Sequence, residues 1–113
     1  MSQAIFPPPV EALPLADIPL PGLTAYLAQG AGHQILFMEF AADAELPEHS
    51  HAGQWGIVLE GEIELTVAGV PATYRKGDRY FIPAGTPHSA LIHAGYADIT
   101  FFDQQDRYRT KPD

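Results

Sequence analysis

From residue 24 onward the sequence alternates short runs of strand-forming residues with turn residues, and this rhythm limits the fold more than any other feature. The clearest runs span residues 34–40, 55–59, 62–67, 89–93 and 97–102. The third run alternates strictly and places Ile63, Leu65 and Val67 on one face. Glycine-containing turns separate the runs, and no stretch has a convincing helical period. The pattern therefore predicts an all-β fold, an antiparallel barrel or sandwich formed by residues 24–106.

The two ends of the chain differ from this β-strand region. Residues 1–23 contain six prolines interleaved with apolar side chains. Proline disfavours a regular helix or a central strand, and the apolar content is too high for a solvated linker. We therefore expect an extended arm that lies across an apolar surface of its own barrel or of a neighbouring chain. Residues 107–113 are expected to form a polar C-terminal tail.

Two histidines and a later histidine form the strongest candidate site. His49 and His51 are two residues apart, so on a strand their side chains point to the same face, and Gln54 follows three residues later. A third imidazole, from His88 on a neighbouring strand, could complete a site for a divalent transition metal. The alternative is a pair of surface histidines in a loop and a His88 that only follows a turn.

The spacing of these residues resembles the two sequence motifs of the cupin superfamily, and in particular small single-domain metal-binding cupins of the cupin 2 conserved barrel type. The matching positions are His49, His51 and Gly61 in the first motif and Gly77, Pro83, Gly85 and His88 in the second. The chain departs from the motifs at Asp43, Gln54 and Ile92. The resemblance implies an antiparallel jelly-roll barrel and a metal held by His49, His51, Gln54 and His88. It also makes His33 a candidate for an additional ligand, because some members recruit a fourth histidine.

Gln54 stands where the superfamily usually places a glutamate. An amide is neutral, so three histidines and a glutamine leave the ion its full positive charge, which favours Lewis-acid chemistry over oxidation of the metal. Zinc or nickel is therefore favoured, with iron or manganese as the alternative. Gln54 could instead form only a hydrogen bond to a ligand.

Catalytic groups are less well defined. Cysteine is absent, so a thiol nucleophile is excluded. Tyr80, Tyr96 and Asp98 are candidates for acid-base roles. The tyrosines could instead pack at the barrel rim, and Asp98 could orient a ligand histidine.

The charge of the chain limits its partners. The formal net charge is −8, and all six basic residues occur from Arg75 onward. Such a surface repels nucleic acid and anionic lipid, and no apolar run is long enough to span a membrane, so we expect a cytoplasmic protein that binds a small molecule inside the barrel. An anionic substrate would need the metal itself, or Arg75, Lys76 and Arg79, to hold it.

The strand that begins near Gln54 also predicts an interface. If Gln54 faces the interior, then Trp55, Ile57 and Leu59 face outward, and so large an apolar patch needs cover. A homodimer or the proline-rich arm would supply it.

Three functions are consistent with these features. The resemblance to small polyketide-cyclase-like cupins implies a non-redox, metal-dependent enzyme that cyclises or isomerises a small carbonyl or aromatic compound. The resemblance to cupin dioxygenases supplies an alternative. A non-catalytic sensor or metal-binding module is the third, because ligand residues alone do not establish turnover.

Overall fold

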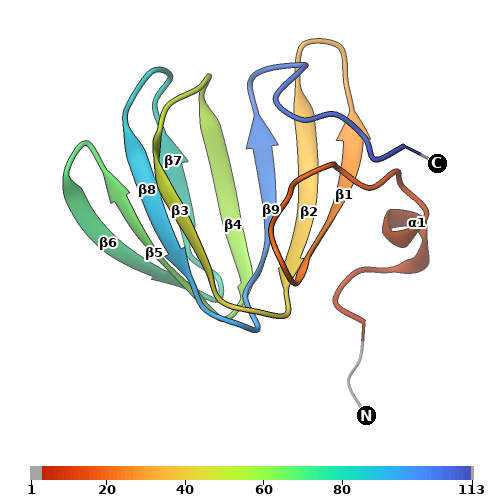
Figure 1. Ribbon diagram of the computed structural model, residues 1–113, viewed down its shortest axis with the longest axis horizontal. Helices are drawn as coiled ribbons and strands as arrows, with labels where there is room; N and C mark the ends of the chain where they lie inside the picture. The colour runs from red at the N-terminus through yellow and green to blue at the C-terminus, as the bar shows by residue number, and fades with distance from the viewer. Residues whose placement is uncertain (1–3, 113) are drawn as a thin grey trace.

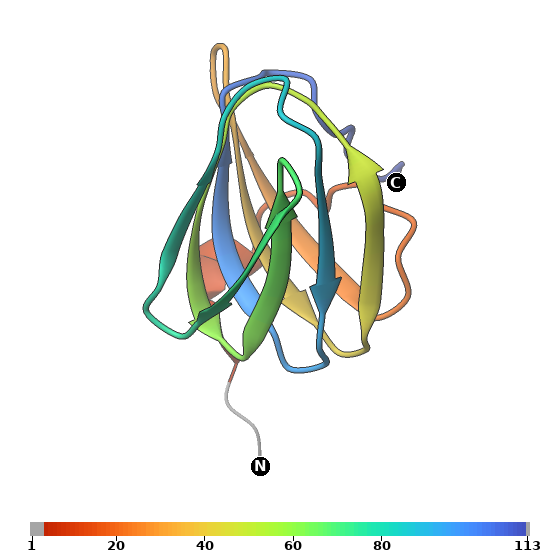
Figure 2. The ribbon, with the colours of Figure 1, turned by 90° about the vertical axis from the view of Figure 1, so that its left-hand side faces the viewer.

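The computed structural model describes residues 4–112 and consists of two antiparallel β-sheets packed face to face (Figures 1 and 2). The strands are β1 (Leu23–Gln29), β2 (Gln34–Phe40), β3 (Ala44–His49), β4 (Gln54–Glu60), β5 (Glu62–Val67), β6 (Val70–Arg75), β7 (Arg79–Ile82), β8 (His88–Ile92) and β9 (Ala97–Phe102). One sheet has the order β1-β2-β9-β4-β7, and the other has the order β3-β8-β5-β6. The expected all-β jelly-roll architecture is confirmed.

Strand β9 lies between β2 and β4 in the larger sheet. It pairs with β2 on one side and with β4 on the other, so a strand from the end of the chain lies at the centre of the larger sheet. In the smaller sheet β8 lies between β3 and β5. These long-range pairings place the β3–β4 segment next to the start of β8, which is where the motif histidines lie.

The side chains alternate across β4 as the sequence predicts. Gly56 and Val58 face the interior, while Trp55 and Ile57 face outward and are each 44% exposed. Gly56 has no room for a side chain, because an added Cβ would lie about 2.2 Å from the ring of Tyr80. The inner face of β4 therefore approaches the tyrosine closely, at the level of the candidate site.

The N-terminal arm departs from the extended path expected for it. Residues Pro8–Glu11 form one turn of helix, α1. Proline is tolerated there because the first residues of a helix have no intrahelical partner for their N–H groups. The ring of Phe6 packs edge-on against Tyr26 and Phe37 and is buried, so the arm covers the β1–β2 part of its own sheet.

The C-terminal segment runs back across the same region (Figure 1). Residues 103–112 follow β9 and pass beside the arm, where Ala16 pairs with Thr110 and the amide of Lys111 bonds to the carbonyl of Leu15. We call these ten residues the strap. Within the described part of the chain, no helix is both long enough and apolar enough to cross a membrane.

Candidate metal centre

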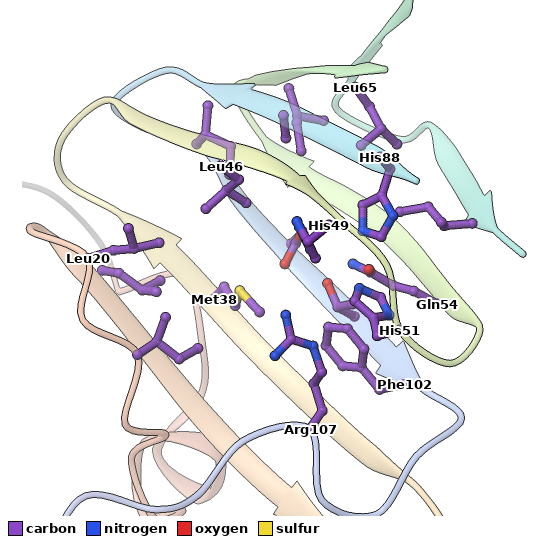
Figure 3. Close-up of a pocket in the computed structure, with 18 of the residues that line it drawn as sticks. Leu20, Met38, Leu46, His49, His51, Gln54, Leu65, His88, Phe102 and Arg107 are labelled. Carbon is purple, nitrogen blue, oxygen red and sulfur yellow. The ribbon is translucent and has the colours of Figure 1, made fainter. Parts of the chain in front are cut away.

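Three histidines meet at one end of the space between the sheets (Figure 3). His49 is the last residue of β3 and pairs with His88, the first residue of β8. His51 lies in the loop that leads to β4. One ring nitrogen from each imidazole lies within 4.8 Å of the other two, and the ring centroids are 4.2–5.3 Å apart.

Backbone carbonyls fix the tautomer of each histidine. Nδ1 of His49 lies 2.8 Å from the carbonyl of Pro47, Nδ1 of His51 lies 2.7 Å from that of Ala52, and Nδ1 of His88 lies 2.9 Å from that of Thr86. A carbonyl only accepts hydrogen bonds, so each Nδ1 must carry the proton. The lone pair of each Nε2 is then free, which is the arrangement that metal-binding histidines need.

The surroundings keep two of these imidazoles neutral. Burial and, to a smaller extent, the nearby positive charge of Arg107 lower the pKa of His51 to about 4, although the hydrogen bond to the carbonyl of Ala52 acts in the opposite direction. Burial also lowers the pKa of His88, and His49 and Arg107 act in the same direction. A neutral imidazole is the form that binds a metal, so the donor set fits a divalent transition metal ion.

Gln54 lies at the start of β4 beside the three histidines. Its amide group points toward the same space (Figure 3), and its Nε2 is 3.5 Å from the hydroxyl of Tyr80. If Nε2 donates to Tyr80, the carbonyl oxygen of the amide is free to act as a fourth ligand. The position of Gln54 is therefore compatible with direct metal ligation and with a role as a hydrogen-bonding neighbour of the site.

The other two histidines lie away from the cluster. His33 stacks on Phe101, with the ring centroids 5.1 Å apart, and does not join the three ligands. The strand register places Phe101 beside the outward-facing Trp55, so His33 belongs to the outer face of the sheet. His93 is exposed and pairs with Glu64.

A cavity of about 100 Å³ extends from the histidines into the space between the sheets. Its apolar walls include Met38, Leu46, Leu65 and Phe102 from the strands, and Ile18 and Leu20 from the arm. The arm therefore completes the wall of the cavity. A ligand in this space would be largely removed from water.

A buried carboxyl group and two tyrosines lie inside the barrel. Asp98 is only 3% exposed, and its Oδ2 accepts hydrogen bonds from Tyr96 at 2.6 Å and from Tyr80 at 3.2 Å. Its Oδ1 has no hydrogen-bond partner among the described residues. Burial raises the pKa of Asp98 to about 6, while the hydroxyl of Tyr96 acts in the opposite direction.

The positions of Tyr80, Tyr96 and Asp98 do not match the alternatives of rim packing and of orienting a ligand histidine. Tyr80 and Tyr96 are buried with their hydroxyls on Asp98, so they are not rim residues. The hydrogen bonds of Asp98 go to tyrosines, and the ligand histidines are held by backbone carbonyls instead. Tyr80 and Asp98 both line the cavity.

Arg107 is the site residue that the sequence pattern did not reveal. It projects from the strap into the cavity mouth, beside His49 and His51 (Figure 3). The basic cluster considered earlier lies elsewhere: Arg75 pairs with Glu62 and Lys76 pairs with Glu60 on the exposed surface. An arginine followed by a tyrosine shortly after the last strand is the only local signal that could have drawn attention to it.

Two facing antiparallel sheets with a three-histidine cluster at the mouth of their cavity define a jelly-roll domain with a candidate metal centre. The family described as "Cupin domain" matches residues 36–103, which is more than half of the chain. The protein therefore belongs to the cupin domain family. No curated protein matches the sequence.

Solved structures agree with this assignment. An RmlC-like cupin from Shewanella frigidimarina is similar over 83% of this chain and 86% of its own, with 26% identity and a TM-score of 0.71. KdgF from Halomonas sp. is 22% identical over 80% of this chain and 87% of its own, with a TM-score of 0.68. A structure of oxalate decarboxylase from Bacillus subtilis with Mn(II) centres is 20% identical over 75% of this chain but only 26% of its own, with a TM-score of 0.65.

Proposed function

We propose that this cupin is a non-redox, metal-dependent enzyme that isomerises or cyclises a small carbonyl compound inside the cavity. The observation that carries the proposal is the pairing of two features at one cavity. Three histidines with free Nε2 atoms lie at its mouth, and a buried carboxyl group, Asp98, lines its wall.

His49, His51 and His88 would hold the ion, with Gln54 as the fourth ligand. A bound divalent ion supplies Lewis-acid polarisation of a carbonyl oxygen. We favour zinc or nickel because the donor set is neutral. Manganese and iron are the alternatives, and the Mn(II) centres of the Bacillus oxalate decarboxylase keep manganese in consideration.

Asp98 is the proposed proton acceptor. Its Oδ1 accepts no hydrogen bond from residues 4–112, and burial raises its pKa to about 6, near the range in which a general base works well. Tyr80 and Tyr96 hold Oδ2 and fix the direction of the carboxyl group. The proton would move from the carbon next to the substrate carbonyl to Asp98 and return to a different position of the same molecule, so no oxidant is needed.

The test is exchange of protons next to a carbonyl in heavy water. Metal-free protein is reloaded separately with zinc, nickel, manganese or iron and incubated with a panel of small ketones and 2-oxo acids, and deuterium uptake is followed by NMR. We expect metal-dependent exchange that is lost in both His88→Ala and Asp98→Asn. Oxygen consumption by the iron or manganese form would favour a dioxygenase, and tight ligand binding without exchange would favour a sensor.

A further inference from the structure

Arg107 places a positive charge at the mouth of the cavity, and no carboxylate of the described residues pairs with it. Its side chain lines the mouth together with His49 and His51. Among residues 4–112 no carboxylate lies within ion-pair distance of its guanidinium group, and its Nε is buried without a hydrogen-bond partner. Arg79 and Arg109 also have no acidic partner among the described residues, but their side chains are exposed, whereas Arg107 is half-buried at the mouth of the cavity.

The guanidinium group is held in place. It lies over the ring of Tyr108 at 4.3 Å and 5.9 Å from the centroid of Phe102. The backbone of Tyr108 is in turn fixed by the buried side chain of Gln34. Arg107 is therefore oriented before any ligand arrives, which lowers the entropy cost of binding.

The position of this charge has an electrostatic consequence. A cation beside three imidazoles opposes the binding of a metal ion, because like charges repel strongly where water is excluded. An anion that lies between the metal and Arg107 removes this repulsion. Arginine also binds carboxylates through two parallel hydrogen bonds, so it suits this role better than a lysine would.

We propose that Arg107 binds the carboxylate group of the ligand, and that the apolar remainder of that ligand fills the cavity between the sheets. The inference rests on the proposed function in one respect, since it takes the cavity as the ligand site. It goes further by assigning the ligand class, a small organic acid with an apolar body, and by naming the residue that selects it.

Binding of phenylacetate and its neutral analogue phenylacetamide tests the proposal. Affinities are measured by calorimetry with zinc-loaded protein, for wild type, Arg107→Gln, Arg107→Lys and Arg109→Gln. Arg109 is the matched control, because it lies on the same strap and its side chain is exposed. We expect Arg107→Gln to weaken phenylacetate binding by about tenfold or more, as the loss of a charged hydrogen-bonding pair predicts.

The other arms make the result specific. Phenylacetamide binding should change little in Arg107→Gln, Arg107→Lys should recover part of the lost affinity for phenylacetate, and Arg109→Gln should match wild type. Zinc content and thermal unfolding confirm that each variant is folded and loaded. The proposal is overturned if wild type does not prefer the acid to the amide, or if Arg107→Gln weakens both probes equally.

This experiment is independent of turnover. If carboxylate binding depends on Arg107 but no proton exchange occurs, the proposed reaction fails and the ligand class stands. If exchange occurs with neutral ketones and Arg107→Gln has no effect on acid binding, the reaction stands and the assignment of Arg107 fails.

Discussion

The side chain of Gln34 forms two hydrogen bonds with the backbone of a single residue, Tyr108. Its Nε2 donates to the carbonyl oxygen at 2.8 Å, and its Oε1 accepts from the amide at 3.0 Å. Gln34 is 1% exposed and is the first residue of β2, 74 positions before Tyr108 in the sequence. This buried amide therefore holds the strap, and with it Arg107, against the barrel.

Removing the amide of Gln34 should loosen the strap. We expect Gln34→Ala to lower the free energy of unfolding by about 2–3 kcal/mol, because it leaves both backbone groups of Tyr108 without a partner. Urea unfolding measures the loss, and hydrogen exchange at the Tyr108 amide should become faster. Gln105→Ala is the control, since that side chain is exposed. Unchanged exchange at Tyr108 would contradict the role of Gln34.

Metal content should depend on the motif histidines. We expect His51→Ala and His88→Ala each to retain well under one equivalent of divalent metal, because a four-ligand site rarely survives the loss of one donor. Elemental analysis of the purified variants gives the answer. His93→Ala is the control, because His93 is exposed and bonded to Glu64. Full occupancy in both ligand variants would refute the site.

Replacing Gln54 tests whether its amide reaches the metal. A carboxylate at this position adds negative charge, so Gln54→Glu should bind divalent ions at least as tightly and shift the preference toward iron or manganese. A competition titration with zinc and manganese measures the shift. If the relative preference does not change, Gln54 only bonds to Tyr80.

Asp98 should make stability depend on pH in a predictable direction. Its pKa is about 6 in the folded protein against 3.8 ordinarily, so between these values the folded state binds more protons than the unfolded state. The contribution of Asp98 to the free energy of unfolding therefore falls by about 2 kcal/mol as the pH rises from 4 to 7.

The histidines change stability in the opposite sense over the same range. The lowered pKa of His51 means that the folded state excludes a proton that the unfolded state binds, so its contribution rises with pH. Comparing wild type with Asp98→Asn cancels that effect. The stability of Asp98→Asn relative to wild type should increase from pH 4 to pH 7, as measured by urea unfolding. A constant difference would show that Asp98 titrates normally.

The outer face of the larger sheet should form a homodimer. Trp55 and Ile57 are each 44% exposed and Phe81 is 50% exposed, and such a patch on a folded domain usually meets a partner. We expect light scattering to give a dimer mass that Trp55→Glu reduces to a monomer. Leu91→Glu is the control, because Leu91 is similarly exposed but lies on the other sheet. If the wild-type protein has the mass of a monomer at micromolar concentrations, the proposed interface is refuted.

The sequence predicts those parts of the protein that depend on local pattern. The alternation in β5 and the outward placement of Trp55 and Ile57 follow from the two-residue period of a strand, and the structure confirms both. The two-residue spacing likewise predicts that His49 and His51 lie close together, whereas His88 joins them through the pairing of β3 with β8.

Long-range contacts explain what the sequence does not reveal. Arg107 reaches the site because contacts far away in the chain hold the strap, among them the bonds of Gln34 to Tyr108 and of the arm to Arg109 and Lys111. The buried tyrosine pair depends on β7 and β9 lying on either side of β4, an arrangement that no local pattern encodes. The helical turn at Pro8–Glu11 was missed for a different reason, because proline forbids the middle of a helix but not its start.

Two parts of the chain form the wall of the cavity, the strands and the N-terminal arm, and they differ in how well they tolerate substitution. The metal ligands and Asp98 belong to paired strands and their connecting loops, whereas Ile18 and Leu20 come from an arm that lies outside both sheets. Substitutions in the arm can therefore alter the shape of the space offered to a ligand without disturbing a strand pair or a histidine. In a directed-evolution experiment, we therefore expect substitutions at residues 18–20 to change which ligand is bound, while the metal ligands and Asp98 remain unchanged.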